Sequence, residues 1–512
     1  MKKFFFYGVL QLICFQITRA QENVIPGEFP DPSIVEVNGV YYACGSSNDW
    51  GPVFPVYKST DLRNWTFLSY VFNEAPAWTI NSYWAPELYY HNGQFYCYYT
   101  ARRKDGVSCI GVATTKNIGQ GFQDKGVLVE WGNEAIDAFV YKENEKLFIT
   151  WKAYGLTQGR PIQVLGSELN ADGLSLKGEA FTILTAEKDS WEAGGIEGQC
   201  VIKNNGYLYM LYSGNGCCGG GCNYQVGVAR AKTMKGPWEK YAGNPLLKSN
   251  ADWKCPGHGT ALKTKDTWAY LYHAYPAAGF PFLGRTALMS EIEWSKNGWP
   301  SFKPAPADRK QGLQSANIQD AFNGDKLAPW WRYDVASYNF NASIKEGNLH
   351  LTEVGRSEKN HTGTALCVNP SVSEFDINTR IIGKNQALKG LVLYGTSANS
   401  VGIGVKQDTI LVWVVLDGKY TELNRAVIQD ASVVQLKAMV TGARNVNFFY
   451  SLNYSDWVQI HGIDGTNPVN AAHLQWWSWG LKAGLFVKTD PATGDNEAVF
   501  DEFTLSNLIP KP

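Results

Sequence analysis

The chain has 512 residues, a formal net charge of -1 and only 18% charged residues. No block or stripe of Lys and Arg occurs along it, so a nucleic-acid partner lacks the electrostatic footprint that phosphate binding needs. The length exceeds one ordinary hydrophobic core and predicts two or three domains, or two large all-β domains.

The first residues have the pattern of a targeting segment. Lys2 and Lys3 precede an apolar run that begins at Phe4 and ends before a small-residue Thr-Arg-Ala site. The run is too short to span a bilayer, so we predict a signal peptide over residues 1–20 and an exported protein, periplasmic or secreted, without a transmembrane segment. A lipoprotein with Cys14 as the anchor is the alternative, although Ile rather than a small residue precedes it.

Residues 21–302 repeat a turn followed by an aromatic-rich strand. The five copies begin at Asn38-Gly39, Asn92-Gly93, Asn144-Glu145, Asn205-Gly206 and Lys265-Asp266. The Asn-Gly pairs predict hairpin turns, because Gly accepts positive φ without a steric clash and Asn tolerates it. A second strand pattern recurs between the copies, so each unit holds several strands. The sequence therefore predicts a five-bladed β-propeller.

The propeller pattern ends near Trp299, and the Pro- and Ala-containing residues 303–316 are interpreted as a linker. Residues 317–512 contain short alternating strands separated by polar turns, which predicts a jelly-roll-type β-sandwich and makes the whole chain all-β. Asp320 near its start and Asp501-Glu502 near its end are either a calcium site or solvated carboxylates at strand ends.

Cysteine spacing leaves two interpretations open. Removal of the leader takes Cys14 and leaves nine cysteines, with Cys217, Cys218 and Cys222 close together in a Gly-rich segment. This cluster fits a zinc knot or disulfide bonds, and an exported location favours disulfides. The pairing is not fixed by the sequence, and the odd number requires at least one free thiol.

Three carboxylates stand at equivalent positions in the repeat. Asp31 lies in Phe-Pro-Asp-Pro before the first aromatic strand, Asp137 in Ile-Asp-Ala before the third, and Glu197 in Ile-Glu-Gly before the fourth. The first strands of propeller blades line the central channel, so these acids are expected to converge on one pocket. A turn-capping role is the alternative for any one of them taken alone.

Together these motifs resemble glycoside hydrolase family 43, over roughly residues 24–300. Further agreement comes from Trp84 in Tyr-Trp-Ala-Pro-Glu, His258 in Cys-Pro-Gly-His-Gly and Arg285 in Gly-Arg-Thr. The resemblance implies a five-bladed propeller that acts on arabinose- or xylose-containing glycans, or in some branches on galactans, with inversion at the anomeric carbon.

By this resemblance, Asp31 is the general base, Glu197 the general acid and Asp137 the residue that tunes the pKa of the acid and positions it. Inverting enzymes place the base and the acid about 6.5–9.5 Å apart, so that a water molecule fits between them. Because the acid must be protonated, we expect burial and the charge of Asp137 to raise the pKa of Glu197.

Four further residues are predicted to bind substrate. Trp84 and Phe139 would form apolar walls, Arg285 would donate hydrogen bonds to sugar hydroxyls, and His258 would lie near the channel. The alternatives are core packing for the two aromatic residues, an ordinary salt bridge for Arg285 and a buried hydrogen-bonded imidazole for His258. No cofactor is required and no metal ligand is assigned, but a structural calcium ion in the channel or in the sandwich is left open.

The functional hypothesis is an inverting, exo-acting hydrolase that removes terminal α-L-arabinofuranosyl residues from plant cell-wall polysaccharide or oligosaccharide. The 19 Trp and 27 Tyr residues suit the apolar C–H faces of such sugars, although strand packing explains most of them. A β-D-xylosidase or an exo-galactanase is the alternative within the family. A non-catalytic glycan-binding protein is the alternative from another class, and a monomer is expected.

The sandwich is expected to brace the propeller rather than to bind polysaccharide, and exo action is inferred by analogy with family members that carry such a domain. Its candidate binding platforms are Trp330, Trp331, Trp476 and Trp477. Adjacent residues in a strand point to opposite faces, so one ring of each pair should point inward and the other outward.

Overall fold

The computed structural model describes residues 21–265, 267–303, 316–337, 340–462, 465 and 467–508. The predicted signal peptide and nearly all of the predicted linker lie outside these residues. Within them the chain is built from β-strands and short 3₁₀ turns, namely η1 (Ile118–Gln120), η2 (Val335–Ser337) and η4 (Ala472–Leu474). No helix in this part of the chain is long and apolar enough to cross a membrane.

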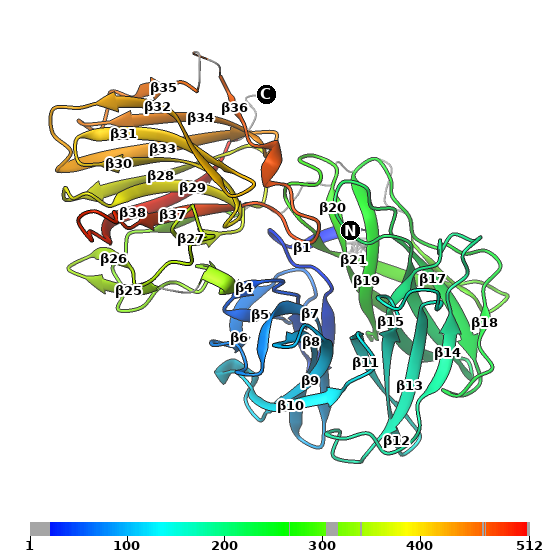
Figure 1. The fold of residues 1–512 in the computed structure, drawn as a ribbon. Helices are drawn as coiled ribbons and strands as arrows, with labels where there is room; N and C mark the ends of the chain where they lie inside the picture. Colours follow the sequence, from blue (N-terminus) through cyan, green and yellow to red (C-terminus); the bar gives the residue numbers. More distant parts are fainter. Residues whose placement is uncertain are drawn as a thin grey trace, which may run out of the picture.

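The first domain consists of five antiparallel sheets, four of them four-stranded (Figure 1). The first sheet contains β2 (Ser33–Val37), β3 (Val40–Cys44), β5 (Val53–Ser59) and β6 (Thr66–Phe72), and the second contains β7 (Thr79–His91), β8 (Gln94–Arg103), β9 (Ser108–Thr115) and β10 (Gln123–Val129). The third contains β11 (Ala135–Glu143), β12 (Lys146–Ala153), β13 (Gln163–Leu169) and β14 (Phe181–Thr185). The fourth contains β15 (Ile196–Asn204), β16 (Tyr207–Gly214), β17 (Gln225–Ala231) and β18 (Glu239–Lys240).

The fifth sheet closes the ring with the beginning of the described chain. It contains β19 (Trp253–Lys263), β20 (Trp268–Pro276), β21 (Thr286–Trp294) and β22 (Pro300–Phe302), and β1 (Glu22–Ile25) pairs with β21. The first strands of the blades, β2, β7, β11, β15 and β19, contact one another in a closed circle. The predicted five-bladed propeller is confirmed, and these inner strands surround its axis.

The repeated turns of the sequence are the hairpins between the first two strands of each blade. At the first of them, Asn38 and Gly39 both have positive φ, 52° and 79°, as a two-residue hairpin turn requires. The second strands are buried almost along their whole length, as β16 is from Leu208 to Gly214, because neighbouring blades cover both of their faces. This packing explains why the aromatic and branched residues run nearly without interruption there.

The second domain is a sandwich of two antiparallel sheets, as predicted (Figure 1). The larger sheet contains β23 (Ile318–Asp320), β25 (Phe340–Lys345), β26 (Asn348–Glu353), β28 (Phe375–Ile382), β33 (Val433–Thr441), β34 (Asn445–Ser451), β35 (Val458–Ile460), β36 (Val469–Asn470) and β38 (Glu497–Asn507). The smaller contains β27 (Thr364–Val368), β29 (Leu388–Thr396), β30 (Asn399–Lys406), β31 (Thr409–Leu416), β32 (Lys419–Val427) and β37 (Lys482–Lys488). Strands β28 and β33 alternate between buried and partly exposed residues, because one face meets the core and the other does not.

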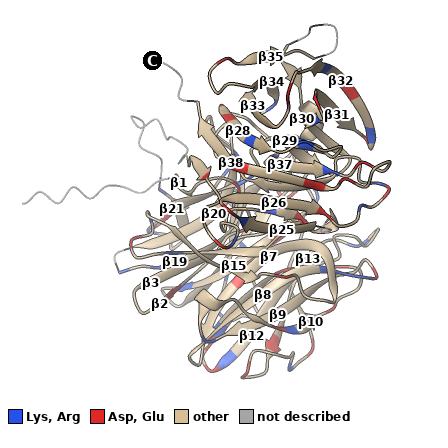
Figure 2. Cartoon of the chain, turned by 90° about the vertical axis from the view of Figure 1, so that its left-hand side faces the viewer, with Lys and Arg blue, Asp and Glu red and all other residues tan. Residues whose placement is uncertain are grey.

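The two domains lie directly against each other (Figures 1 and 2). Strand β4 (Trp50–Gly51) of the propeller pairs with β24 (Tyr333–Asp334), which joins the domains by backbone hydrogen bonds. The buried Arg332 side chain donates to the carbonyl oxygens of Trp50 and Gly51. Acidic and basic residues are otherwise interspersed over both domains (Figure 2).

A buried ion pair also crosses the interface. Lys482, with 3% of its side chain exposed, pairs with Glu28, with 6% exposed, and the second Glu28 oxygen accepts a hydrogen bond from the Gly480 amide at 3.0 Å. Water cannot replace either partner easily, so each charge depends on the other.

We therefore expect Lys482→Met to lower the free energy of unfolding by about 3–5 kcal/mol, because it leaves the Glu28 carboxylate buried without its cation. Urea unfolding followed by tryptophan fluorescence measures the change. The double variant Glu28→Gln/Lys482→Met should recover much of the loss, since it removes both charges; an equal or larger loss in the double variant would contradict this account.

Candidate active site

The acids found in the sequence occupy irregular points of the inner strands. Strand pairing is interrupted between Ile136 and Phe139 in β11 and between Glu197 and Cys200 in β15. Asp137 has a φ of 59°, and Asp31, just before β2, has a φ of 49°. A bulge redirects the side chain at that point of a strand. The three carboxylates thus turn into one pocket of about 300 Å³ at the centre of the propeller.

Asp31 is held by the Arg285 guanidinium and by a hydroxyl donor. Its Oδ1 accepts a hydrogen bond from Arg285 Nη1 at 2.7 Å, and its Oδ2 accepts one from the Ser46 hydroxyl at 2.6 Å. Burial alone would raise the pKa of Asp31, but the Arg285 guanidinium, together with His273 and His258, holds it well below its usual value. Asp31 is therefore ionised at neutral pH.

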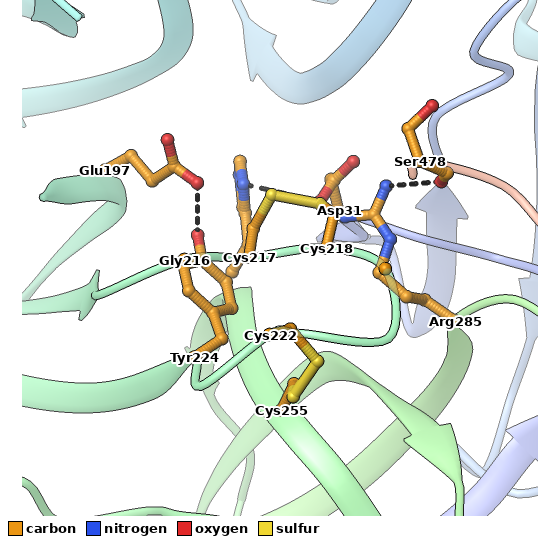
Figure 3. The surroundings of a disulfide bond; sticks show 12 residues. Asp31, Glu197, Gly216, Cys217, Cys218, Cys222, Tyr224, Cys255, Arg285 and Ser478 are labelled. Carbon is orange, nitrogen blue, oxygen red and sulfur yellow. Dashed lines mark hydrogen bonds and ion pairs between the residues drawn. A yellow bond between two sulfur atoms is a disulfide. The ribbon is translucent and has the colours of Figure 1, made fainter. Parts of the chain in front are cut away.

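Glu197 lies on the other side of the pocket and has two donors of its own. Lys152 Nζ donates to Oε2 at 2.7 Å, and the Tyr224 hydroxyl donates to Oε1 at 2.9 Å (Figure 3). Burial raises the pKa of Glu197, yet the charge and hydrogen bond of Lys152 outweigh it and the net shift is downward. The expectation of a raised pKa for Glu197 in the free protein is therefore wrong, because it did not include this lysine.

The carboxyl group whose pKa is raised is that of Asp137. Its Oδ2 accepts a hydrogen bond from the Gly198 amide at 3.1 Å and lies 3.6 Å from His258 Nδ1. Burial raises the pKa of Asp137 to about 7, helped by the negative charge of Glu197 and opposed by His258. Adjacent carboxyl groups cannot both ionise freely, so Asp137 and Glu197 together retain one proton up to near neutral pH.

Two glycines make this arrangement sterically feasible. A Cβ at Gly198, whose φ is 57°, would approach the His258 ring to 2.7 Å, and a Cβ at Gly257 would approach the Tyr224 ring to 2.0 Å. The Glu-Gly and Gly-His-Gly patterns of the sequence therefore reflect the close packing of imidazole, phenol and backbone beneath the carboxylates.

Three of the four residues predicted to bind substrate lie at the pocket. Trp84, His258 and Arg285 line the pocket with the acids. Arg285 donates one hydrogen bond from Nη1 to Asp31 and one from Nη2 to the Ser478 carbonyl oxygen, the latter at 3.2 Å. The prediction that Phe139 binds substrate is wrong, because its side chain is 7% exposed and packs in the core of the third and fourth blades. The bulge directs Ile136 to the pocket instead.

The sandwich domain contributes to the pocket wall. Trp477 and Ser478 line the pocket, and the Trp477 ring meets the Trp84 ring edge to face at a centroid distance of 5.8 Å. Trp330 is 41% exposed and Trp331 3%, so one ring of this pair points outward and the other inward, but the pair lies in a turn before β24 and strand alternation is not the cause. The expectation is wrong for Trp476 and Trp477, which are 37% and 48% exposed and also lie outside the strands.

The cysteines form two disulfides, Cys217–Cys218 and Cys222–Cys255, which excludes the zinc knot. Among the described residues, Cys44, Cys97, Cys109, Cys200 and Cys367 are free and buried. No group of three or more His, Cys, Asp or Glu side chains in the described ranges is arranged for a metal ion. In the sandwich, Asp320 accepts from the Trp331 indole and Asp501 pairs with Arg380, so a calcium ion would compete with these partners.

Sequence reasoning missed Lys152 and Tyr224. Lys152 follows the buried run Leu147–Trp151 of strand β12 and precedes the buried Ala153, and it also pairs with Glu134 at 3.3 Å. A single lysine inside such a strand is a usable signal, because an unpaired buried cation is costly. Tyr224 carried no such signal, since tyrosine is common throughout the blades.

A propeller with a pocket that combines an ionised carboxylate and a proton-sharing carboxyl pair has the equipment of a glycoside hydrolase. Residues 20–300 match the model of glycosyl hydrolases family 43, and residues 319–506 match the beta xylosidase C-terminal concanavalin A-like domain. The chain belongs to glycoside hydrolase family 43.

Individual relatives are distant. The chain is 26% identical to the extracellular endo-α-(1→5)-L-arabinanase 1 of Bacillus subtilis, over 53% of this chain and 87% of that protein. It is also 26% identical to an extracellular exo-α-(1→5)-L-arabinofuranosidase of Cellvibrio japonicus, over 57% and 90%. The crystal structure of a xylan β-1,4-xylosidase from Bacillus halodurans has the same fold, with a TM-score of 0.81, 21% identity, and coverage of 96% of this chain and 100% of that one.

The shared proton can be observed directly. In ¹³C-carboxyl NMR, we expect one carboxyl resonance of the pocket to titrate with a pKa of about 7 in the free protein, as burial of Asp137 requires. The resonance should disappear in Asp137→Asn. Full ionisation of both Asp137 and Glu197 below about pH 5, where ordinary carboxyl groups have lost their protons, would contradict the shared proton.

Proposed function

We propose that the protein is an inverting, exo-acting glycosidase that removes terminal α-L-arabinofuranosyl residues. The observation that carries the proposal is the pocket itself, in which Asp31 is held ionised while Asp137 and Glu197 share one proton. The 26% identity to an exo-acting arabinofuranosidase supports the choice of sugar. A β-D-xylosidase is the second candidate, favoured by the match of residues 319–506 to a β-xylosidase C-terminal domain.

In this proposal Asp31 acts as the general base. A water molecule attacks the anomeric carbon, the new C–O bond forms, and the water proton passes to Asp31. Arg285 and Ser46 fix the two Asp31 oxygens, so the carboxylate is oriented before the water arrives. The Arg285 charge keeps Asp31 deprotonated between turnovers.

Glu197 acts as the general acid. The glycosidic C–O bond breaks, its electron pair goes to the leaving oxygen, and Glu197 supplies the proton to that oxygen. The proton that the pair retains near neutral pH resides mainly on Asp137 in the free protein, and we propose that it moves to Glu197 when the leaving oxygen displaces Lys152 from Oε2. Asp137 is thus the tuning and positioning residue.

The wall that the sandwich supplies supports exo action. Trp477 and Ser478 close one side of a pocket of about 300 Å³, a volume at the lower limit for small-molecule sites. A pocket of this kind accepts one end of a glycan chain more readily than its middle. An exported location is part of the proposal, supported by the two disulfides.

The first test compares an aryl α-L-arabinofuranoside with an aryl β-D-xyloside. We expect faster hydrolysis of the arabinofuranoside and a loss of at least about 10³-fold in kcat for Asp31→Ala, because the base is removed. Product NMR should show inverted anomeric configuration. Preference for the xyloside would select the second candidate, and binding of glycans without hydrolysis would select the glycan-binding alternative.

The role of the acid is tested by changing the leaving group. Glu197→Ala should lose at least about 10²-fold in kcat with a poor leaving group, but much less with dinitrophenolate, which departs without a proton. Asp31→Ala should be equally impaired with both leaving groups. Equal impairment of Glu197→Ala on both would exclude Glu197 as the proton donor.

The pH dependence of kcat/KM follows from the three pKa shifts. Asp31 is ionised well below pH 4, so activity should hold from there upward and fall above about pH 7, where the carboxyl pair loses its proton. Asp137→Asn removes a negative charge that favours the proton on Glu197, so this alkaline limb should move to lower pH. Lys152→Met removes a cation and should move it to higher pH; shifts of the opposite sign would contradict the assignment.

A further inference from the structure

A disulfide between adjacent residues forms part of the pocket surface. Cys217 and Cys218 are bonded to each other, are half-buried and line the same pocket as Asp31, Asp137 and Glu197. Figure 3 shows the pair above the loop between β16 and β17, with Glu197 and Tyr224 on one side and Asp31 and Arg285 on the other. The proposed mechanism gives this disulfide no role.

The loop that carries the pair is anchored on three sides. The second disulfide joins Cys222 to Cys255 in β19, and the Gly219 amide donates to the Tyr275 hydroxyl at 3.0 Å. A Cβ at Gly219 would lie 3.4 Å from Gln475 and Trp477, so the sandwich loop rests directly on it. The Cys217–Cys218 pair is therefore held in place by both domains.

The chemistry of this surface differs from that of the other pocket walls. A disulfide has no N–H or O–H donor, and its sulfur atoms are polarizable and accept hydrogen bonds only weakly. The pocket otherwise presents many charged groups, including Lys152, Arg102 and Glu134 beside the three acids. A sugar ring carries hydroxyls at its edge and C–H bonds on its faces, so it needs an apolar surface as well as polar partners.

The geometry points to the Cys217–Cys218 disulfide as an apolar wall of the terminal-sugar subsite, one that contacts a C–H face of the pentosyl ring and determines specificity. This inference rests on the proposed function and refines it. With Trp84 and Trp477 it supplies the apolar part of a site whose remaining groups bind hydroxyls and transfer protons.

A purely structural role of the disulfide would act through Tyr224. Tyr224 follows Cys222 by two residues, and its hydroxyl donates to Glu197 at 2.9 Å. If the pair only shaped the loop, its removal would displace Tyr224 and change the ionisation of Glu197. The alkaline limb of the pH profile therefore separates a wall that contacts sugar from a brace that positions the phenol.

The test uses Cys217→Ser/Cys218→Ser in the full chain. We expect KM to rise about tenfold, as for loss of an apolar subsite contact, with kcat within about threefold and the alkaline limb unchanged. Cys367→Ala, which removes a buried cysteine in the sandwich, is the matched control and should keep the wild-type KM. A wild-type KM in the double variant, or a shifted alkaline limb with unchanged KM, would overturn the inference.

A second measurement tests the inference if Cys217→Ser/Cys218→Ser fails to fold. In Cys222→Ser/Cys255→Ser the adjacent pair is the remaining disulfide among the described residues, so a phosphine reductant should raise KM about tenfold and reoxidation should restore it. Peptide mass spectrometry of residues 214–225 follows the oxidation state. Reduction without any change in KM would overturn the inference.

Binding without turnover separates this inference from the proposed function. Quenching of tryptophan fluorescence by L-arabinose and by D-xylose reports occupancy of the subsite whether or not the protein hydrolyses glycosides. Pentose binding that weakens about tenfold in Cys217→Ser/Cys218→Ser supports the wall even if no aryl glycoside is cleaved. If the protein hydrolyses glycosides but the wild type and the double variant bind pentose equally well, the proposed function stands and the inference about the disulfide wall is overturned.

Discussion

The structure depends on one constraint: the inner strands of the blades must leave regular pairing where they reach the axis. A regular strand alternates its side chains between two faces and would direct each acid into the packing between blades. Bulges in β11 and β15 and the positive φ of Asp31 and Asp137 redirect the carboxylates into the channel instead. Backbone conformations of this kind persist only where the surroundings enforce them. The closed ring of five tightly packed blades provides that enforcement.

The pocket treats its three acids differently by means of their nearest partners. A guanidinium lies against Asp31 and an ammonium against Glu197, whereas Asp137 receives one backbone amide and an imidazole at 3.6 Å. Burial acts on all three in the same direction, so the distribution of cations decides which group keeps a proton. A neutral carboxyl beside two anions is thus a property of the whole cluster, in which Lys152 comes from the third blade and Arg285 from the fifth.

Much of the fold was predictable from local signals. The Asn-Gly turns at Asn38 and Asn92 mark hairpins because they depend only on the conformational freedom of two residues. The acids were found because each interrupts an apolar run. The predictions that failed depended on contacts between residues distant in sequence or on irregular pairing. Lys152, on a neighbouring blade, reverses the expected direction of the pKa shift of Glu197. The bulge at Asp137 turns the Phe139 side chain into the core. To predict the pocket wall formed by Trp477, one must know how the two domains dock.

The pairing of β1 with β21 has a consequence for how the molecule is made. Asn23 lies opposite Leu288, so the strand that appears first in synthesis waits for a partner more than two hundred residues later. Entropy opposes closing so long a loop, and pairings so distant in sequence slow folding. The ring therefore cannot close on a nascent chain until its last blade has emerged.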